Sequence, residues 1–210
     1  MKAVFLDLDG TIMDSQAGII ASLKHAFHAI DRPDLAETDL KWMIGPPFID
    51  SFTKIGLSNP HDAIEAYRVH YQASGMFDAS VYPGIPKALD DLLAADFRLY
   101  LATAKPHLYA RKITAHFGIA ARMTMEFGPE TDGTRNWKGD LLAHALEQTG
   151  EDPKRSVMVG DRHHDMAAAA EVGMPSIAVR WGYGHAEEWQ TAAHIIDDAS
   201  ELPSAIQKLP

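Results

Sequence analysis

The sequence contains no cysteine. Disulfide bonds, thiolate metal ligands and a cysteine nucleophile are therefore excluded. No apolar run approaches the roughly 20 residues that a membrane-spanning helix needs. An aspartate at position 7 comes too early for the apolar part of a signal peptide. We therefore expect a cytoplasmic protein without a membrane partner.

Positive charge is also scarce. The chain has 19 Lys and Arg residues against 29 Asp and Glu residues, which gives a formal net charge of −10. Binding to a nucleic acid polymer depends on basic patches, so we expect no such partner. If the substrate is an anion, a bound cation or a few well-placed lysines must supply positive charge locally.

The rest of the composition is typical of a folded protein. Of the 210 residues, 46% are hydrophobic and 23% are charged, so the chain is long enough and apolar enough to bury a core. Apolar segments that predict strands alternate with helical patterns of about ten residues. The predicted strands are 3–8, 97–103, 123–127, 156–159, 176–179 and 194–196. This alternation predicts an α/β fold, a Rossmann-like doubly wound parallel sheet with helices on both faces.

One long region interrupts the alternation. Residues 14–80 show helical patterns at 15–30, 36–43, 48–54 and 61–73, and strand patterns resume only after residue 80. We therefore predict an α/β core domain over residues 1–13 and 81–210, with an inserted all-helical domain over residues 14–80.

Two carboxylates stand at the end of the first strand. Side chains two apart in a strand point the same way, so Asp7 and Asp9 project together, and Gly10 supplies a turn that a Cβ would resist. Their repulsion calls for a cation or a proton. This pattern indicates a metal-assisted site with one nucleophile and one acid/base group. The alternative is an acidic turn that caps a helix.

Further polar residues follow later strands, at the edge where ligands bind in such sheets. The Thr103 hydroxyl and the Ala104 N–H can form an anion cradle, unless Thr103 only caps the next helix. Lys138 opposes the dipole of its helix, so it either binds an anion or is a solvated lysine. Asp165 follows Asp161 by four residues and either lies near it or is an ordinary first-turn carboxylate.

These residues together carry a resemblance to a known family. Asp7-Leu8-Asp9-Gly10-Thr11, Thr103, Lys138 and residues 157–165 resemble, in order, the four motifs of the haloacid dehalogenase-like hydrolase superfamily. The resemblance covers the whole chain, and the helical insert is similar to a cap of the C1 type. Segments 45–47, 82–84 and 105–106 look most like the phosphoglycolate phosphatase-like branch, which also includes proteins described as 5′-nucleotidases.

The resemblance implies a Mg²⁺-dependent hydrolase of phosphate monoesters. Asp7 is then the nucleophile that forms an aspartyl phosphate, and Asp9 is the acid/base that protonates the leaving oxygen. Thr103, Ala104, Leu8 and Lys138 bind and neutralise the phosphoryl group.

The resemblance also implies the metal site. Mg²⁺ is held by Asp7, the backbone carbonyl of Asp9 and Asp161, with Asp165 and Thr11 in supporting positions. Because these ligands are oxygens, the site suits Mg²⁺. We therefore do not assign the adjacent histidines 163 and 164 to the metal, and we expect both to be solvated.

The substrate is a small phosphate ester. Phosphoglycolate is the first candidate, nucleoside monophosphates are the alternative, and a sugar phosphomutase or a non-catalytic binding protein is less favoured. Asp9 argues against a dehalogenase, because the dehalogenases of this superfamily lack an acid at the second position. We expect a monomer or a weak dimer, and we expect the helical cap to select the leaving group.

Overall fold

The computed structural model describes residues 3–209. They form two compact units, one built from the residues up to Met13 and from Val81 onward, the other from Asp14–Ser80. The role of the second unit as a cap domain stays a prediction. Within residues 3–209, no helix combines the length and the apolar character needed to cross a lipid bilayer.

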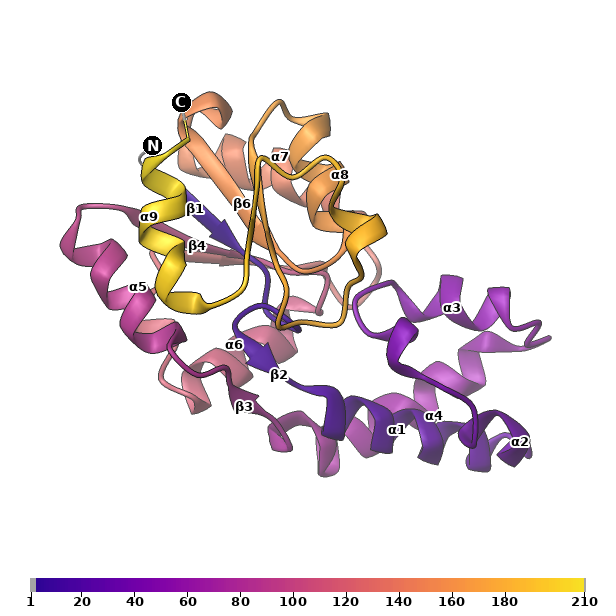
Figure 1. Ribbon diagram of the computed structural model, residues 1–210. Coiled ribbons are helices and arrows are strands. Elements are labelled where there is room, and N and C mark those ends of the chain that lie inside the picture. The colour runs from indigo at the N-terminus through magenta and orange to yellow at the C-terminus, as the bar shows by residue number, and fades with distance from the viewer. Residues whose placement is uncertain (1–2, 210) are drawn as a thin grey trace. The chain divides into compact units, whose positions relative to one another are not determined.

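The first unit is built on a six-stranded sheet (Figure 1). In spatial order its strands are β5 (Met125–Phe127), β4 (Arg98–Ala102), β1 (Ala3–Leu6), β6 (Ser156–Gly160), β7 (Ser176–Val179) and β8 (His194–Ile196). Every neighbouring pair is parallel. The predicted doubly wound parallel sheet is therefore confirmed.

The central position of β1 decides where the site can form. Leu6 at its end pairs with Leu101 of β4 on one side and with Val159 of β6 on the other. The carboxyl ends of the three strands therefore lie side by side. Strands β4 and β5 lie on one side of β1, and β6, β7 and β8 lie on the other. The strand order therefore reverses at β1, which makes this edge a topological switch point, the usual place for a ligand.

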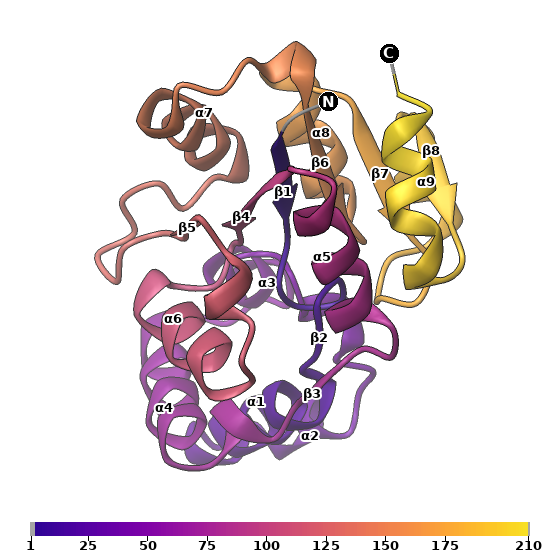
Figure 2. The same cartoon turned by 90° about the vertical axis from the view of Figure 1, so that its left-hand side faces the viewer.

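Helices cover both faces of this sheet. In Figures 1 and 2, α5 (Ile85–Ala94) and α9 (Leu202–Gln207) lie on one face, and α7 (Lys138–Thr149) and α8 (His163–Glu171) lie on the other. Helix α6 (His107–His116) joins β4 to β5. Apolar side chains of β1, β4, β5 and β6 form one core cluster with those of α7 and α8. Its largest members are Phe5, Tyr100, Phe127, Leu141, Leu142 and Met158.

The second unit contains α1 (Gln16–Ala29), α2 (Pro33–Ala36), α3 (Phe48–Lys54) and α4 (Pro60–Ala73). Aromatic rings fill its interior. Phe48 stacks on Phe52, with ring centroids 5.7 Å apart, and Tyr67 stacks on Tyr71 at 5.3 Å. Because Tyr67 and Tyr71 are 5% and 1% exposed, these rings are part of the core of this unit.

Two sequence predictions for this region are wrong. Residues 36–43 do not form one helix, because α2 ends at Ala36 and only a 3₁₀ turn follows at Lys41–Met43. Between them the Thr38 hydroxyl donates to the Leu35 carbonyl and the Asp39 carboxylate accepts the Lys41 N–H. Such side-chain bonds compete with the helical backbone.

The prediction that residues 14–80 contain helices and no strand is also wrong at both ends of this range. Two-residue strands, β2 (Met13–Asp14) and β3 (Ser80–Val81), pair where it begins and ends. Two residues are too short to give a periodic pattern, so sequence reasoning could not detect them.

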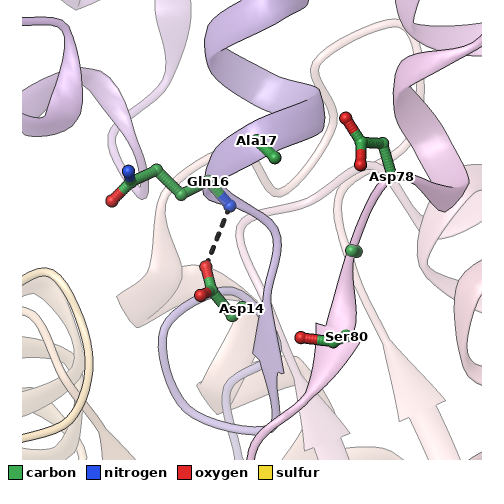
Figure 3. A pocket seen from close by; sticks show the side chains of 6 residues that line it. Asp14, Gln16, Ala17, Asp78 and Ser80 are labelled. Carbon is green, nitrogen blue, oxygen red and sulfur yellow. Dashed lines mark hydrogen bonds between the residues drawn. The ribbon is translucent and has the colours of Figure 1, made fainter.

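A pocket of about 330 Å³ lies within the second unit, beside these strands (Figure 3). Asp14, Gln16 and Ala17 line it from one segment, and residues 78–80 line it from the other. The Gln16 N–H donates to Asp14 Oδ1 at 3.2 Å. None of the predicted site residues lines this pocket.

Two helical glycines provide a matched test of packing. A Cβ on Gly18 of α1 would collide with the backbone carbonyl of Gly75, whereas a Cβ on Gly139 of α7 would meet only the flexible end of Glu171. We expect Gly18→Ala to destabilise the protein by about 1–3 kcal/mol. We expect Gly139→Ala to be neutral or to stabilise it by up to about 1 kcal/mol, because alanine favours a helix. Urea unfolding followed by circular dichroism measures both, and equal shifts would contradict this packing.

Candidate active site

Three carboxylates meet at the carboxyl edge of the sheet. Asp7 directly follows β1, Asp161 directly follows β6, and Asp165 lies in the first turn of α8. Each offers an oxygen that lies within 4.8 Å of the others. All three are buried, with exposed fractions of 5%, 0% and 1%. Asp165 is therefore part of the cluster and not an ordinary carboxylate on a helix surface.

Lys138 neutralises part of this cluster. Its Nζ lies 2.9 Å from Asp7 Oδ1 and also pairs with Asp165 Oδ1. Burial alone would lower the pKa of Lys138, but the charges of Asp165 and Asp7 outweigh it and raise that pKa above its ordinary value. The side chain is a buried ammonium, so the alternative of a solvated lysine is wrong.

The cluster is still short of positive charge. With all three carboxylates ionised, the single ammonium of Lys138 would leave the cluster with a net charge of −2. Burial and the charges of Asp165 and Asp7 raise the pKa of Asp161 well above its usual value. Asp7 Oδ1 and Asp165 Oδ1 meet Lys138 as ion pairs, but neither accepts a well-aligned hydrogen bond within residues 3–209. Buried oxygens in this state fit a hard divalent cation such as Mg²⁺.

Asp9 has a lysine of its own. Lys105 Nζ lies 3.0 Å from Asp9 Oδ2, and the two residues are 8% and 9% exposed. The two aspartates that the sequence places side by side are therefore each paired with a different cation. Lys105 was not among the predicted site residues. Its position two residues after Thr103, at the end of β4, was the available signal.

Thr103 is buried at the end of β4, where it bonds to the neighbouring strand β5 and to the residue two positions further along the chain. Its N–H donates to the Phe127 carbonyl at 3.1 Å, and its hydroxyl accepts the Lys105 N–H at 3.2 Å. The residue at the N-cap of α6 is Pro106, so Thr103 does not cap that helix. The hydroxyl is held at the edge of the sheet, where the predicted anion cradle with Ala104 requires it.

Leu8 contributes through its backbone. Its side chain is fully buried, and its carbonyl accepts N–H groups from Ile12 at 3.0 Å and from Met13 at 2.8 Å. These bonds close the turn after β1. They direct the chain back beneath Asp9, which forms a β-bridge with Met13.

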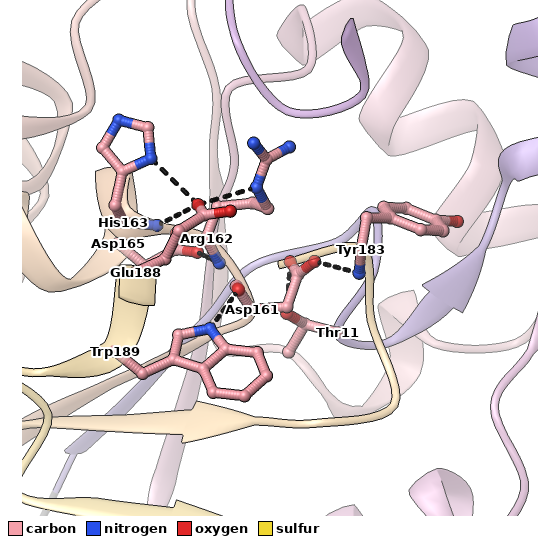
Figure 4. A network of polar contacts seen from close by, with 8 residues as sticks. All are labelled: Thr11, Asp161, Arg162, His163, Asp165, Tyr183, Glu188 and Trp189. Atoms are coloured by element: carbon pink, nitrogen blue, oxygen red, sulfur yellow. Dashed lines mark hydrogen bonds and ion pairs between the residues drawn. The ribbon is translucent and has the colours of Figure 1, made fainter. Parts of the chain in front are cut away.

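Asp161 is held by segments far apart in the chain (Figure 4). The Tyr183 N–H donates to its Oδ2 at 2.6 Å, and the Trp189 indole N–H donates to its backbone carbonyl at 2.6 Å. The Thr11 hydroxyl reaches Oδ1 at 3.4 Å, and Trp181 donates to the Thr11 carbonyl at 3.0 Å. The segment after β7 therefore fixes the orientation of this carboxylate. Sequence reasoning missed that segment.

Two glycines allow the backbone to lie close to the Asp161 side chain. Gly10 has a φ of +83°, and a Cβ there would lie 2.6 Å from Asp161 Cγ. A Cβ on Gly182 would lie 2.5 Å from Asp161 Oδ2. Gly10 thus makes the turn predicted for it, and the alternating glycines of segment 181–184 were the signal for the second contact.

A separate ionic network fixes the loop between β6 and α8. Glu188 Oε2 accepts the His163 N–H at 3.0 Å and lies 3.0 Å from Arg162 Nε, and His163 Nδ1 lies 2.9 Å from it (Figure 4). Burial alone would raise the pKa of Glu188, but these bonds lower it to about 2. The Arg162 N–H donates to Asp165 Oδ2 at 3.0 Å, so the network also supports the metal-ligand candidates.

The two histidines at the start of α8 differ in their exposure. His163 is exposed, as predicted, but His164 is half-buried. Burial and the nearby charges of His163 and Arg162 lower the pKa of His164 to about 4. The expectation that both histidines are solvated is therefore correct for His163 alone.

Comparisons with known proteins agree with this geometry. The model of a family described as haloacid dehalogenase-like hydrolase matches residues 4–179. The tyrosine-protein kinase PtkA of Mycobacterium tuberculosis is 44% identical over 188 residues, which cover 89% of this chain and 64% of PtkA. This chain therefore spans less than two thirds of that relative.

Other relatives match over nearly their whole length. A 5′-nucleotidase of Pseudomonas aeruginosa is 35% identical, covering 97% of this chain and 95% of that protein. A phosphoglycolate phosphatase of Agrobacterium fabrum is 29% identical, covering 99% and 93%. The crystal structure of a "predicted phosphatase" from Clostridium acetobutylicum matches with a TM-score of 0.94 at 33% identity, covering 99% of each chain. These matches support a phosphatase.

The low pKa of Glu188 makes its contribution to stability depend on pH. Its folded pKa lies below its unfolded value, so the stabilisation is present above about pH 4.5 and is lost as the pH falls toward 2. We expect Glu188→Gln to cost about 1 kcal/mol at pH 7, after allowing for screening by solvent. In urea unfolding, the difference in free energy of unfolding between Glu188→Gln and the wild type should become smaller between pH 5 and pH 3. Exposed Glu187→Gln is the control, and a gap that does not change with pH would refute the network.

Proposed function

Because this chain belongs to the haloacid dehalogenase-like hydrolase family, we propose that it hydrolyses small phosphate monoesters through a phosphorylated Asp7. The observation that carries this proposal is the Asp7–Lys138 pair, 2.9 Å apart, within a buried cluster of carboxylates that is short of positive charge. A phosphate ester that enters such a site meets a nucleophile, a fixed ammonium and oxygen ligands for a cation.

Phosphoryl transfer takes place in two steps. Asp7 attacks phosphorus, the bond from phosphorus to the leaving oxygen breaks, and Asp9 gives that oxygen its proton. Water then attacks the phosphorylated Asp7, and Asp9 takes a proton from this water, which restores the enzyme and releases phosphate. Lys138, the Thr103 hydroxyl and the backbone at Leu8 and Ala104 stabilise the charge on the transferring group.

Asp7, Asp161 and Asp165 offer oxygens that lie within 4.8 Å of one another. Of these we assign Asp7 and Asp161 as ligands of Mg²⁺, together with the backbone carbonyl of Asp9, while Asp165 and Thr11 support them. When bound, the cation supplies the positive charge that offsets repulsion between the phosphate and Asp7. Tyr183 and Trp189 keep Asp161 in a fixed orientation toward this site.

Two substrate classes are suggested by the relatives. Phosphoglycolate is the first candidate from the sequence motifs. Nucleoside monophosphates gain support from the full-length relative named 5′-nucleotidase, which is 35% identical, against 29% for the relative named phosphoglycolate phosphatase. We assign the choice between them to the helical unit, residues 14–80, acting as a cap.

A second function has a specific observation in its favour. The relative named tyrosine-protein kinase is 44% identical over 188 residues. In chemical terms, a kinase differs only in donor and acceptor: a nucleoside triphosphate phosphorylates Asp7, and a tyrosine hydroxyl replaces water in the second step. Incubation with ATP and a tyrosine-containing peptide distinguishes the two functions. Phosphotyrosine supports the kinase, and free phosphate from monoesters supports the phosphatase.

Asp7→Asn tests the nucleophile. Because an amide cannot form the phosphorylated intermediate, we expect kcat to fall by at least about 10³-fold. Phosphate release should be measured with Mg²⁺ over p-nitrophenyl phosphate, phosphoglycolate, AMP, GMP and UMP. Asp140→Asn, on an exposed residue of α7, is the matched control and should keep wild-type activity. Near-wild-type turnover by Asp7→Asn would overturn the assignment.

Removal of the metal tests the ligand set. A cation that binds only the folded state stabilises it by about 2.7 kcal/mol at a concentration of 100 times Kd. We therefore expect a higher Tm in Mg²⁺ than in EDTA for the wild type. In Asp161→Asn, half-maximal stabilisation should need at least about tenfold more Mg²⁺. An unchanged Mg²⁺ response in this variant would exclude Asp161 as a ligand.

A further inference from the structure

Lys105 pairs with Asp9 but has no role in the two steps of phosphoryl transfer given above. Lys105 Nζ lies 3.0 Å from Asp9 Oδ2, and the two side chains are only 5% and 11% exposed. Lysine is seldom buried without a partner that offsets the loss of hydration. A buried ammonium at this distance from the proposed acid/base therefore needs an explanation within the site.

Hydrogen bonding and close packing hold the backbone of Lys105 in place. Its N–H donates to the Thr103 hydroxyl at 3.2 Å. Its carbonyl lies so close to Gly128 that a Cβ there would meet the carbonyl oxygen at 2.6 Å. The next turn is fixed in the same way, because the His107 N–H donates to the Pro129 carbonyl at 2.9 Å. The loop after β5 thus holds the segment that carries the ammonium.

The backbone around Asp9 is held by contacts with Met13. It forms a β-bridge with Met13, and the N–H of Gly10 donates to the Met13 carbonyl at 2.8 Å. These contacts fix its backbone. They leave the rotation of the carboxylate to be set by contacts of the side chain, and one of these is the ammonium of Lys105 at Oδ2.

We propose that Lys105 is a positioning residue that holds the Asp9 carboxylate in the orientation required for proton transfer to the leaving oxygen. This inference rests on the proposed phosphatase function. Lys138 forms ion pairs with Asp7 and Asp165, whereas Lys105 forms one with Asp9, so the two lysines have different roles. The competing role for Lys105 is direct binding of the transferring phosphoryl group, and the two roles predict different kinetics.

The leaving group provides the test. An alkyl oxygen must receive a proton as it departs, whereas p-nitrophenolate leaves readily without one. We expect Lys105→Met to lower kcat/KM at least about tenfold more for an alkyl phosphate, such as phosphoglycolate or AMP, than for p-nitrophenyl phosphate. Asp9→Asn should show the same bias. Lys105→Met should add little to Asp9→Asn in the double variant, because residues that act as one unit are not additive.

Lys112→Met is the matched control, because Lys112 is exposed on the neighbouring helix α6. It should leave kcat/KM unchanged for both substrate types. If Lys105→Met does not fold, Lys105→Arg and Lys105→Gln take its place. Arg keeps the charge and should retain more alkyl phosphatase activity than Gln.

An equal loss for alkyl and aryl phosphates would overturn the inference and indicate phosphoryl binding by Lys105. A double variant whose losses multiply would also overturn it. Failure of the proposed function is distinguishable, because in that case the wild type would release phosphate from neither substrate type.

Discussion

The structure of the site depends on one buried ammonium. Lys138 lies between Asp7 and Asp165, at the centre of a group of carboxylates that would otherwise repel one another without solvent to screen them. A lysine in the first turn of a helix opposes the helix dipole, so stability of α7 alone does not explain it. The ion pairs of Lys138 with Asp7 and Asp165 explain why a lysine occupies this position. They hold the cluster together, yet they leave it with an excess of negative charge that a divalent cation can offset.

Strand order explains why residues that lie far apart in the sequence meet at this site. With β1 between β4 and β6, residues that come after the three strands emerge at one edge. Asp7, Thr103 and Asp161 are placed there by topology alone, whatever their side chains. The loops then refine the positions. The bonds from Tyr183 and Trp189 orient Asp161, and the Arg162–Glu188 network fixes the turn that leads to Asp165.

Sequence reasoning predicted the features that depend on periodicity and on residues at strand ends. It identified the parallel sheet and the positions of Asp7, Asp161 and Lys138, because each shows an anomaly that is visible locally. It did not identify Lys105 or the indoles of Trp181 and Trp189. Their roles come from contacts between segments distant in sequence, for which no local pattern exists. The helix predicted over residues 36–43 is wrong for a different reason, because hydrogen bonds between neighbouring residues override the helical periodicity there.

Asp7 and Asp9 form ion pairs with different lysines. This difference explains how two aspartates at the end of one strand can have two chemical roles, nucleophile and acid/base. Asp7 and Asp9 both follow the end of β1 with one residue between them, so their positions in the sequence do not distinguish their roles. Their partners make them different. Asp7 lies with the ammonium of Lys138 inside the metal-ligand cluster, which suits attack on phosphorus, while Asp9 is held apart from that cluster by Lys105. The two lysines thus give different surroundings to two aspartates that are separated by a single residue.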